Sequence, residues 1–139
     1  MNHFKGAKLV LVASAATAAT SAVNTDVIDT AGFEGVAIFG TIAVTNAGNT
    51  LKVQQGAAAN LSDAADLTGT ATATTTNGDA VLVDVFRPRE RYVRGVITRT
   101  ASSATGDFYA VLYNPRTEPV THGATVDSDY FVSPAEGTA

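Results

Sequence analysis

The segment VAIFGTIAV, residues 36–44, decides the fold class because it has the period of a β-strand. Alternate positions line one face of a strand, whereas a helix repeats every three to four residues. The positions between them are also largely apolar, so both faces of this strand can be covered. The alternating set is Val36, Ile38, Gly40, Ile42 and Val44, and the set between them is Ala37, Phe39, Thr41 and Ala43.

Further short segments of the same kind lie on both sides of this strand. Asn46–Asn49 predicts a turn, and Asn77-Gly78 is a strong short turn signal because both residues tolerate positive φ. Ser62 is a good N-cap and allows a short helical turn. Short strands separated by turns indicate a β-sandwich or barrel, and the spacing alone does not separate a jelly roll from an immunoglobulin-like sandwich. The predicted strands are 8–13, 50–55, 69–76, 81–86, 92–100 and 108–113.

The two ends of the chain lack a usable period. Residues 14–25 are small and polar, and the sequence after residue 115 holds two prolines and scattered small residues. We therefore expect one domain over residues 1–139, with its core at 26–115 and extended arms at 1–25 and 116–139. Such arms can become ordered across a neighbouring subunit.

The composition excludes several classes of function. The 139 residues hold 25 Ala, 20 Thr and 16 Val, and β-branched Val and Thr favour strands. The net charge of −4 argues against a nucleic acid partner, which needs surplus Lys and Arg. Without cysteine there are no disulfides and no thiolate chemistry. No stretch approaches the ~18 apolar residues of a membrane span, so we expect no membrane partner.

No pattern of reactive residues predicts an enzyme. His3 and His122 are the two histidines, and neither lies near a patterned Ser, Asp or Glu. The close carboxylate pairs lack the ligand spacing of a calcium loop, and no glycine-rich phosphate motif is present. We expect no catalytic residue, no cofactor and no metal site. The carboxylate pairs are Asp63 with Asp66 and Asp127 with Asp129.

Arginine is the one concentrated residue type. Five of the nine basic residues lie within 13 positions, and Tyr92 stands among them. A solvated strand edge that deters pairing would explain them. A protein interface would also explain them, because Arg binds carboxylates in a bidentate manner and is enriched at interfaces. The candidate protein-interface residues are Arg87, Arg89, Arg91, Tyr92, Arg94 and Arg99.

The N-terminus supports an alternative function. Lys5 and Lys8 precede a short apolar run over residues 9–13, and small residues follow, as in a secretory signal. The apolar run is shorter than usual for such a signal. A secreted or surface-displayed β-sandwich binding module is therefore the second hypothesis, and a mature start near Ala19–Asn24 would support it.

Three segments resemble small head proteins of tailed bacteriophages, above all the cement (capsid-decorating) protein of a short-tailed phage. They run from Gln54 to Thr70, from Val83 to Arg94 and from Ala110 to Thr121, within a resemblance that spans roughly residues 26–121. The most distinctive runs are VDVFRP at 83–88 and AVLYNPR at 110–116.

The resemblance implies a jelly-roll-like β-sandwich that forms a homodimer on the exterior of an icosahedral capsid. Its partner there would be the major capsid protein, whose neighbouring subunits it would clamp together. The residues themselves agree with this implication, since they predict strands, no active site and arms that could reach neighbours. We therefore predict a structural virion protein located on the capsid exterior.

Overall fold

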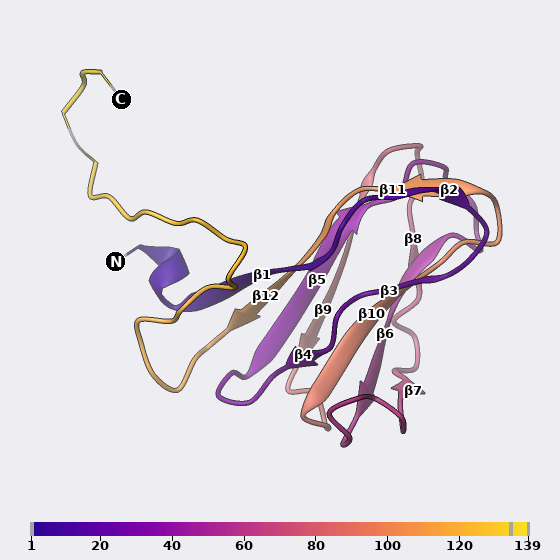
Figure 1. The fold of residues 1–139 in the computed structure, drawn as a ribbon, viewed down its shortest axis with the longest axis horizontal. Coiled ribbons are helices and arrows are strands. Elements are labelled where there is room, and N and C mark those ends of the chain that lie inside the picture. Colours follow the sequence, from indigo (N-terminus) through magenta and orange to yellow (C-terminus); the bar gives the residue numbers. More distant parts are fainter. Residues whose placement is uncertain (1, 134, 139) are drawn as a thin grey trace.

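The computed structural model describes residues 2–133 and 135–138, and these residues contain no α-helix. Six long strands form the body of the molecule, and a 3-10 turn and shorter strands connect them (Figure 1). The long strands are β1 (Ala7–Ala13), β5 (Gly35–Thr41), β6 (Thr50–Gly56), β9 (Ala80–Phe86), β10 (Tyr92–Thr98) and β12 (Phe108–Tyr113). The short elements are η1 (His3–Lys5), β2 (Ala16–Ala19), β3 (Val23–Asn24), β4 (Ile28–Asp29), β7 (Ala65–Asp66), β8 (Thr72–Ala73) and β11 (Ser103–Thr105).

The strands form a jelly-roll sandwich, as predicted. One sheet has the order β1-β12-β5-β9, and all of its pairs are antiparallel. In the second sheet β10 and β6 are central, with β3 and β4 sharing the outer edge of β10 and β7 and β8 sharing the outer edge of β6. We can number the strands of these two sheets from 1 to 8 in chain order, with β3 and β4 counted as one strand and β7 and β8 as another. The first sheet then has the order 1-8-3-6 and the second has the order 2-7-4-5, while β2 and β11 form a separate pair. This order defines a jelly roll.

The alternation predicted over residues 36–44 places the core as expected at Val36, Ile38 and Ile42, but β5 ends at Thr41 and Val44 is exposed. Val36 and Ile38 are buried between the sheets and pack with Leu51 and Val53 of β6. Complete burial of a side chain of this size is worth about 1.5–3 kcal/mol. Phe108 of β12 lies across Gly40, where a Cβ atom would come within 2.6 Å of the ring, so this position needs glycine.

The predicted N-terminal arm is wrong for most of residues 1–25. Residues 7–13 form β1, which pairs with β12, and Val12 is part of the core. Residues 16–19 form β2, which pairs with β11, and Val23 and Asn24 pair with β10. The prediction failed because small Ala, Ser and Thr side chains show no apolar period even when their backbone is in a ladder.

The C-terminal arm is extended, and its first part lies along β1. The backbone N–H of Val120 donates to Lys5 at 3.0 Å, and that of Gly123 donates to Leu9 at 2.9 Å. Further on, the chain leaves the sandwich, and Phe131 and Val132 are exposed (Figure 1). Tyr130 still contacts the His122 ring and the Phe4 backbone oxygen, so the structure confirms an arm only over residues 131–133 and 135–138.

Two predicted turns reverse the chain without making hairpins. Gly78 has φ of 80° and lies in a turn, as expected, but β8 pairs with β6 and β9 pairs with β5. The turn after Asn46 likewise leads from β5 in one sheet to β6 in the other. The strand predicted over 69–76 is reduced to the two residues of β8, and the segment near Ser62 forms turns instead of a helical turn.

Candidate protein-interaction surfaces

Residues 87–91 join β9 to β10 at the end of the sandwich that also carries the loop after β6, and we call them the arginine loop. Arg87 has φ of 52°. Its guanidinium lies 3.5 Å from the Glu34 carboxylate and 5.0 Å from the ring centre of Phe86. Both charged side chains are well exposed, so this ion pair contributes little to stability.

Arg91 is held in place by Asp29. Its Nε and a terminal nitrogen donate to the two carboxylate oxygens at 2.9 and 2.8 Å, and its guanidinium lies 5.1 Å from the ring centre of Tyr92. The hydrogen bond from Arg91 is the main cause that lowers the pKa of Asp29. The two carboxylate bonds and the ring fix the direction of this arginine.

Arg89 and Arg94 differ in their freedom. The Arg89 backbone N–H donates to the Gln55 side chain at 3.2 Å, while its exposed guanidinium makes no hydrogen bond within residues 2–133 and 135–138. Arg94 lies on β10, where its Nε donates to the Gln54 side chain at 2.9 Å. Arg89 is therefore the arginine of this loop that is most available to a partner.

Arg99 does not belong with the exposed arginines. It is 4% exposed, and it donates to the backbone oxygens of Thr17, Ser21 and Ser103 at 2.7–2.8 Å. These bonds tie the segment after β1 to β11. Its proposed place in an interface is wrong, because this chain's own carbonyl groups use its donors and its side chain is buried.

The outward side of the β1-β12-β5-β9 sheet is a second surface, which we call the outer face. Strand register puts apolar residues in cross-strand rows on it. The rings of Phe39 and Tyr109 stack at 5.9 Å, and those of Phe86 and Tyr113 stack at 6.5 Å. Leu82 is 58% exposed and Phe86 is 54% exposed. The other apolar members are Leu9, Leu11, Ala37 and Val111.

On the outer face the Tyr113 hydroxyl and the Asp84 carboxylate are hydrogen-bonded to each other. The Tyr113 ring lies across Gly35, where a Cβ atom would meet it at 2.1 Å, and its hydroxyl donates to Asp84 at 2.6 Å. Burial, with the Asp84 bond as a second cause, raises the pKa of Tyr113 to about 12. The only charged side chain of β9 is thus engaged within its own sheet.

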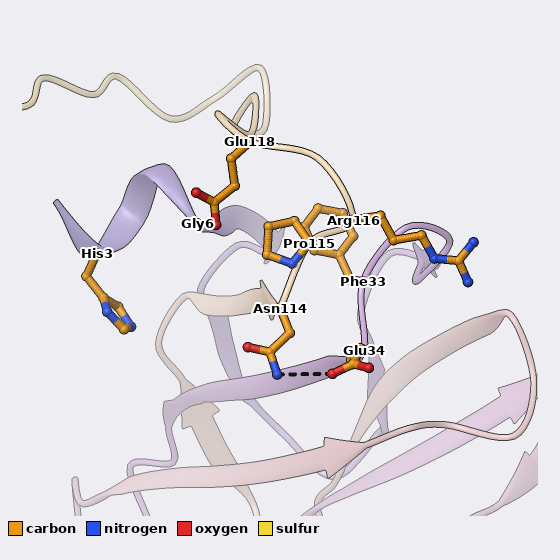
Figure 2. Close-up of a pocket in the computed structure, with 8 residues that line it drawn as sticks. All are labelled: His3, Gly6, Phe33, Glu34, Asn114, Pro115, Arg116 and Glu118. Atoms are coloured by element: carbon orange, nitrogen blue, oxygen red, sulfur yellow. Dashed lines mark hydrogen bonds between the residues drawn. The ribbon is translucent and has the colours of Figure 1, made fainter. Parts of the chain in front are cut away.

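A wide cleft of about 540 Å³ lies beside the outer face, between η1, the turn after β4 and the chain after β12 (Figure 2). Within it the Asn114 amide donates to the Glu34 carboxylate at 3.2 Å, and the Arg116 guanidinium points away (Figure 2). His3 also lines the cleft, where its ring lies apart from the carboxylates of Glu34 and Glu118 (Figure 2). This arrangement offers no paired acid and base.

Among the described residues, no three His, Cys, Asp or Glu side chains gather closely enough to hold a metal ion. No described helix is long and apolar enough to cross a membrane.

The chain shares its fold with a protein of known structure. No protein-family model matches it, and no curated protein is similar to it in sequence. The crystal structure of the PBSX exported protein XepA superposes with a TM-score of 0.56 at 15% identity, covering 96% of this chain and 46% of XepA. At this identity the likeness shows the fold alone. The chain spans about half the length of XepA.

The outer face was not predicted as an interaction surface, although the sequence carries a signal for it. Residues between the core positions are apolar in three adjacent strands, as at Ala37, Leu82 and Val111. A strand that is apolar on both faces is typical of a sheet covered on both sides. In this chain only one of those sides is covered by the second sheet.

Proposed function

We propose that this protein binds the outside of an icosahedral phage capsid and cements neighbouring major capsid subunits. The observation that carries the proposal is the outer face, where two pairs of aromatic rings stack and where Leu82 and Phe86 are more than half exposed. Apolar patches of this kind on a sandwich indicate contact with another protein. An exposed arginine loop at one end adds the donor type enriched at interfaces.

The position of the phage-like segments supports this proposal. The segment from Gln54 begins at the end of β6, the segment from Val83 contains the arginine loop, and the segment from Ala110 includes the turn at Asn114. All three reach the same end of the sandwich. The residues that resemble head proteins therefore gather around the exposed arginines.

A cement protein of this size acts by mass action. A protein that binds the assembled shell and not free subunits stabilises the shell by linkage. Many copies on one lattice add avidity, so single contacts need not be strong. A rigid sandwich with a preformed surface suits this task because little chain entropy is lost on binding.

The test of the binding surface is co-sedimentation of the purified protein with empty phage shells. Arg89→Glu reverses the available charge without breaking a side-chain bond in the described residues, and we expect at least a tenfold loss of affinity, or about 1.4 kcal/mol. Thr76→Glu is the control, because it adds a negative charge to an exposed turn at the opposite end of the sandwich. Equal binding by both variants would remove the arginine loop from the interface.

The second candidate function, a secreted binding module, is favoured by the exported neighbour XepA and by the signal-like N-terminus. Cleavage near Ala19 would, however, remove β1 from its ladder with β12. An export signal that doubles as a strand of the sandwich is a poor candidate for removal. N-terminal sequencing of mature protein decides the matter, since a start within residues 19–24 would support this candidate.

A further inference from the structure

β9 has one open edge in the part of the chain that the structure describes. At both ends of its ladder with β5, an odd-numbered residue makes the hydrogen bond. The Arg87 N–H donates to the Glu34 oxygen at 2.7 Å, and the Asp79 oxygen accepts from the Ile42 N–H at 3.4 Å. Backbone groups alternate between the two sides of an antiparallel strand. The odd-numbered residues of β9 therefore bond to β5, and the N–H and C=O groups of residues 80, 82, 84 and 86 point to the open edge.

The described residues 2–133 and 135–138 cover the opposite edge of the same sheet with backbone and ring hydrogen bonds, and they make none to this edge. At β1, the Leu9 N–H donates to the His122 ring at 2.9 Å, and the Leu9 oxygen accepts from Gly123 at 2.9 Å. Proteins usually protect a free edge with Lys, Pro, a bulge or a covering segment. Ala80–Phe86 has no Lys or Pro, and its register with β5 is unbroken.

The side chains beside the open edge are apolar. Leu82 and Phe86, both more than half exposed, belong to the residues whose backbone groups are free. Asp84 is the one acid among them, and it accepts the Tyr113 hydroxyl. A long apolar edge without protection is a site for pairing with another strand.

We propose that the open edge of β9 pairs antiparallel with β9 of a second copy of this chain across a two-fold axis. Two identical antiparallel strands satisfy two-fold symmetry, so every free N–H group of one strand faces a free C=O group of the other strand. Full overlap of Ala80–Phe86 sets Val83 at the axis and places Leu82 opposite Asp84 of the partner subunit. This register keeps the two Asp84 carboxylates from lying opposite each other, which would be unfavourable. The two outer faces then become one continuous surface.

The test is the mass of the protein in solution, with no shells present. We expect sedimentation equilibrium of the wild type to give twice the chain mass of 14.2 kDa. Leu82→Pro removes only an N–H that faces the open edge, so the monomer keeps its own ladder. We expect it to run as a single chain with an unchanged β-sheet circular dichroism spectrum. Leu82→Thr retains the N–H and is the matched control, which should still associate.

Amide hydrogen exchange of the wild type keeps the proposal testable if Leu82→Pro does not fold. On dimer formation the amides of Leu82, Asp84 and Phe86 should become protected at least tenfold, while those of Val81 and Val83 are already protected by β5. A single-chain mass up to roughly 100 µM, a concentration at which even a weak dimer would form, would overturn the proposal. Free exchange of the even-numbered amides in a dimer would overturn it too. Since shells are absent, failure here is separate from failure of capsid binding.

Discussion

Arg99 is the residue whose loss should cost the most stability among the arginines. It donates to three backbone oxygens in a buried position, and Arg99→Met leaves those acceptors without partners. We expect the free energy of unfolding to fall by about 3 kcal/mol, with a smaller loss for Arg99→Lys, which still reaches one oxygen. Urea denaturation measures both. Arg89→Ala is the control with little effect, and a similar result for Arg99→Met would contradict the structural role.

The sequence could not separate Arg99 from the other arginines. All five lie within 13 positions, and nothing in the neighbours of Arg99 in the chain marks it as buried. Two acceptors of Arg99 come from Ser21 and Thr17, which are 78 and 82 residues earlier in the chain. Burial of this side chain is therefore a consequence of tertiary structure. The exposure of Arg87, Arg89 and Arg91 follows from Pro88 and the short loop, both of which are visible in the sequence.

Tyr113 gives the protein a stability that depends on alkaline pH. Its folded pKa is raised to about 12 by burial, with the Asp84 bond as a second cause. The fold therefore favours the neutral phenol, and this contribution is complete below the unfolded pKa of about 10 and is lost as pH rises towards about 12. Tyr113→Phe should cost about 1 kcal/mol at neutral pH and should remove this part of the pH dependence.

Denaturant midpoints of the wild type and Tyr113→Phe across that pH range test the assignment. The difference between the two proteins should shrink as the pH passes from about 10 to about 12, where the ionised phenol would face the Asp84 carboxylate. A difference that stays constant over the whole range would show that the Tyr113 hydroxyl does not sense its surroundings as described.

Among the elements, β1 decides whether the N-terminal residues are an arm or part of the sandwich. Deletion of residues 1–19 removes β1 and β2 and uncovers the edge of β12, with loss of Val12 from the core. We expect this variant to be insoluble or to lose its cooperative thermal transition. Deletion of residues 133–139 is the control and should leave the melting temperature unchanged. A fully cooperative, soluble Δ1–19 protein would instead favour a cleaved N-terminus.

The long strands were predictable because their residues alternate, but their partners were not. Alternation over 36–44, 81–86 and 108–113 locates β5, β9 and β12 to within a few residues. A turn signal such as Asn77-Gly78 states where the chain reverses and not which sheet receives the next strand. The C-terminal segment on β1 was also missed, because its contacts are backbone hydrogen bonds and one His122 ring, which leave no period in the sequence.

For the whole molecule, local patterns in the sequence predicted a β-sandwich or barrel, and the resemblance to phage head proteins predicted the jelly-roll arrangement. Strand order depends on contacts between residues far apart in the sequence, and no local pattern encodes it. The outer face could have been predicted from the sequence, because β5 is apolar on both sides. The open edge of β9 could not have been predicted from the sequence, because it depends on the order of the strands in the sheet.

The most direct test of the central claim is the thermal melting of empty phage shells with and without saturating amounts of this protein. A protein that binds only the assembled shell must stabilise it by linkage. We predict saturable binding and a raised shell melting temperature, with a smaller rise for Arg89→Glu at the same concentration. Saturable binding with no change in shell melting would contradict a cementing role, and no binding at all would contradict the capsid as the partner.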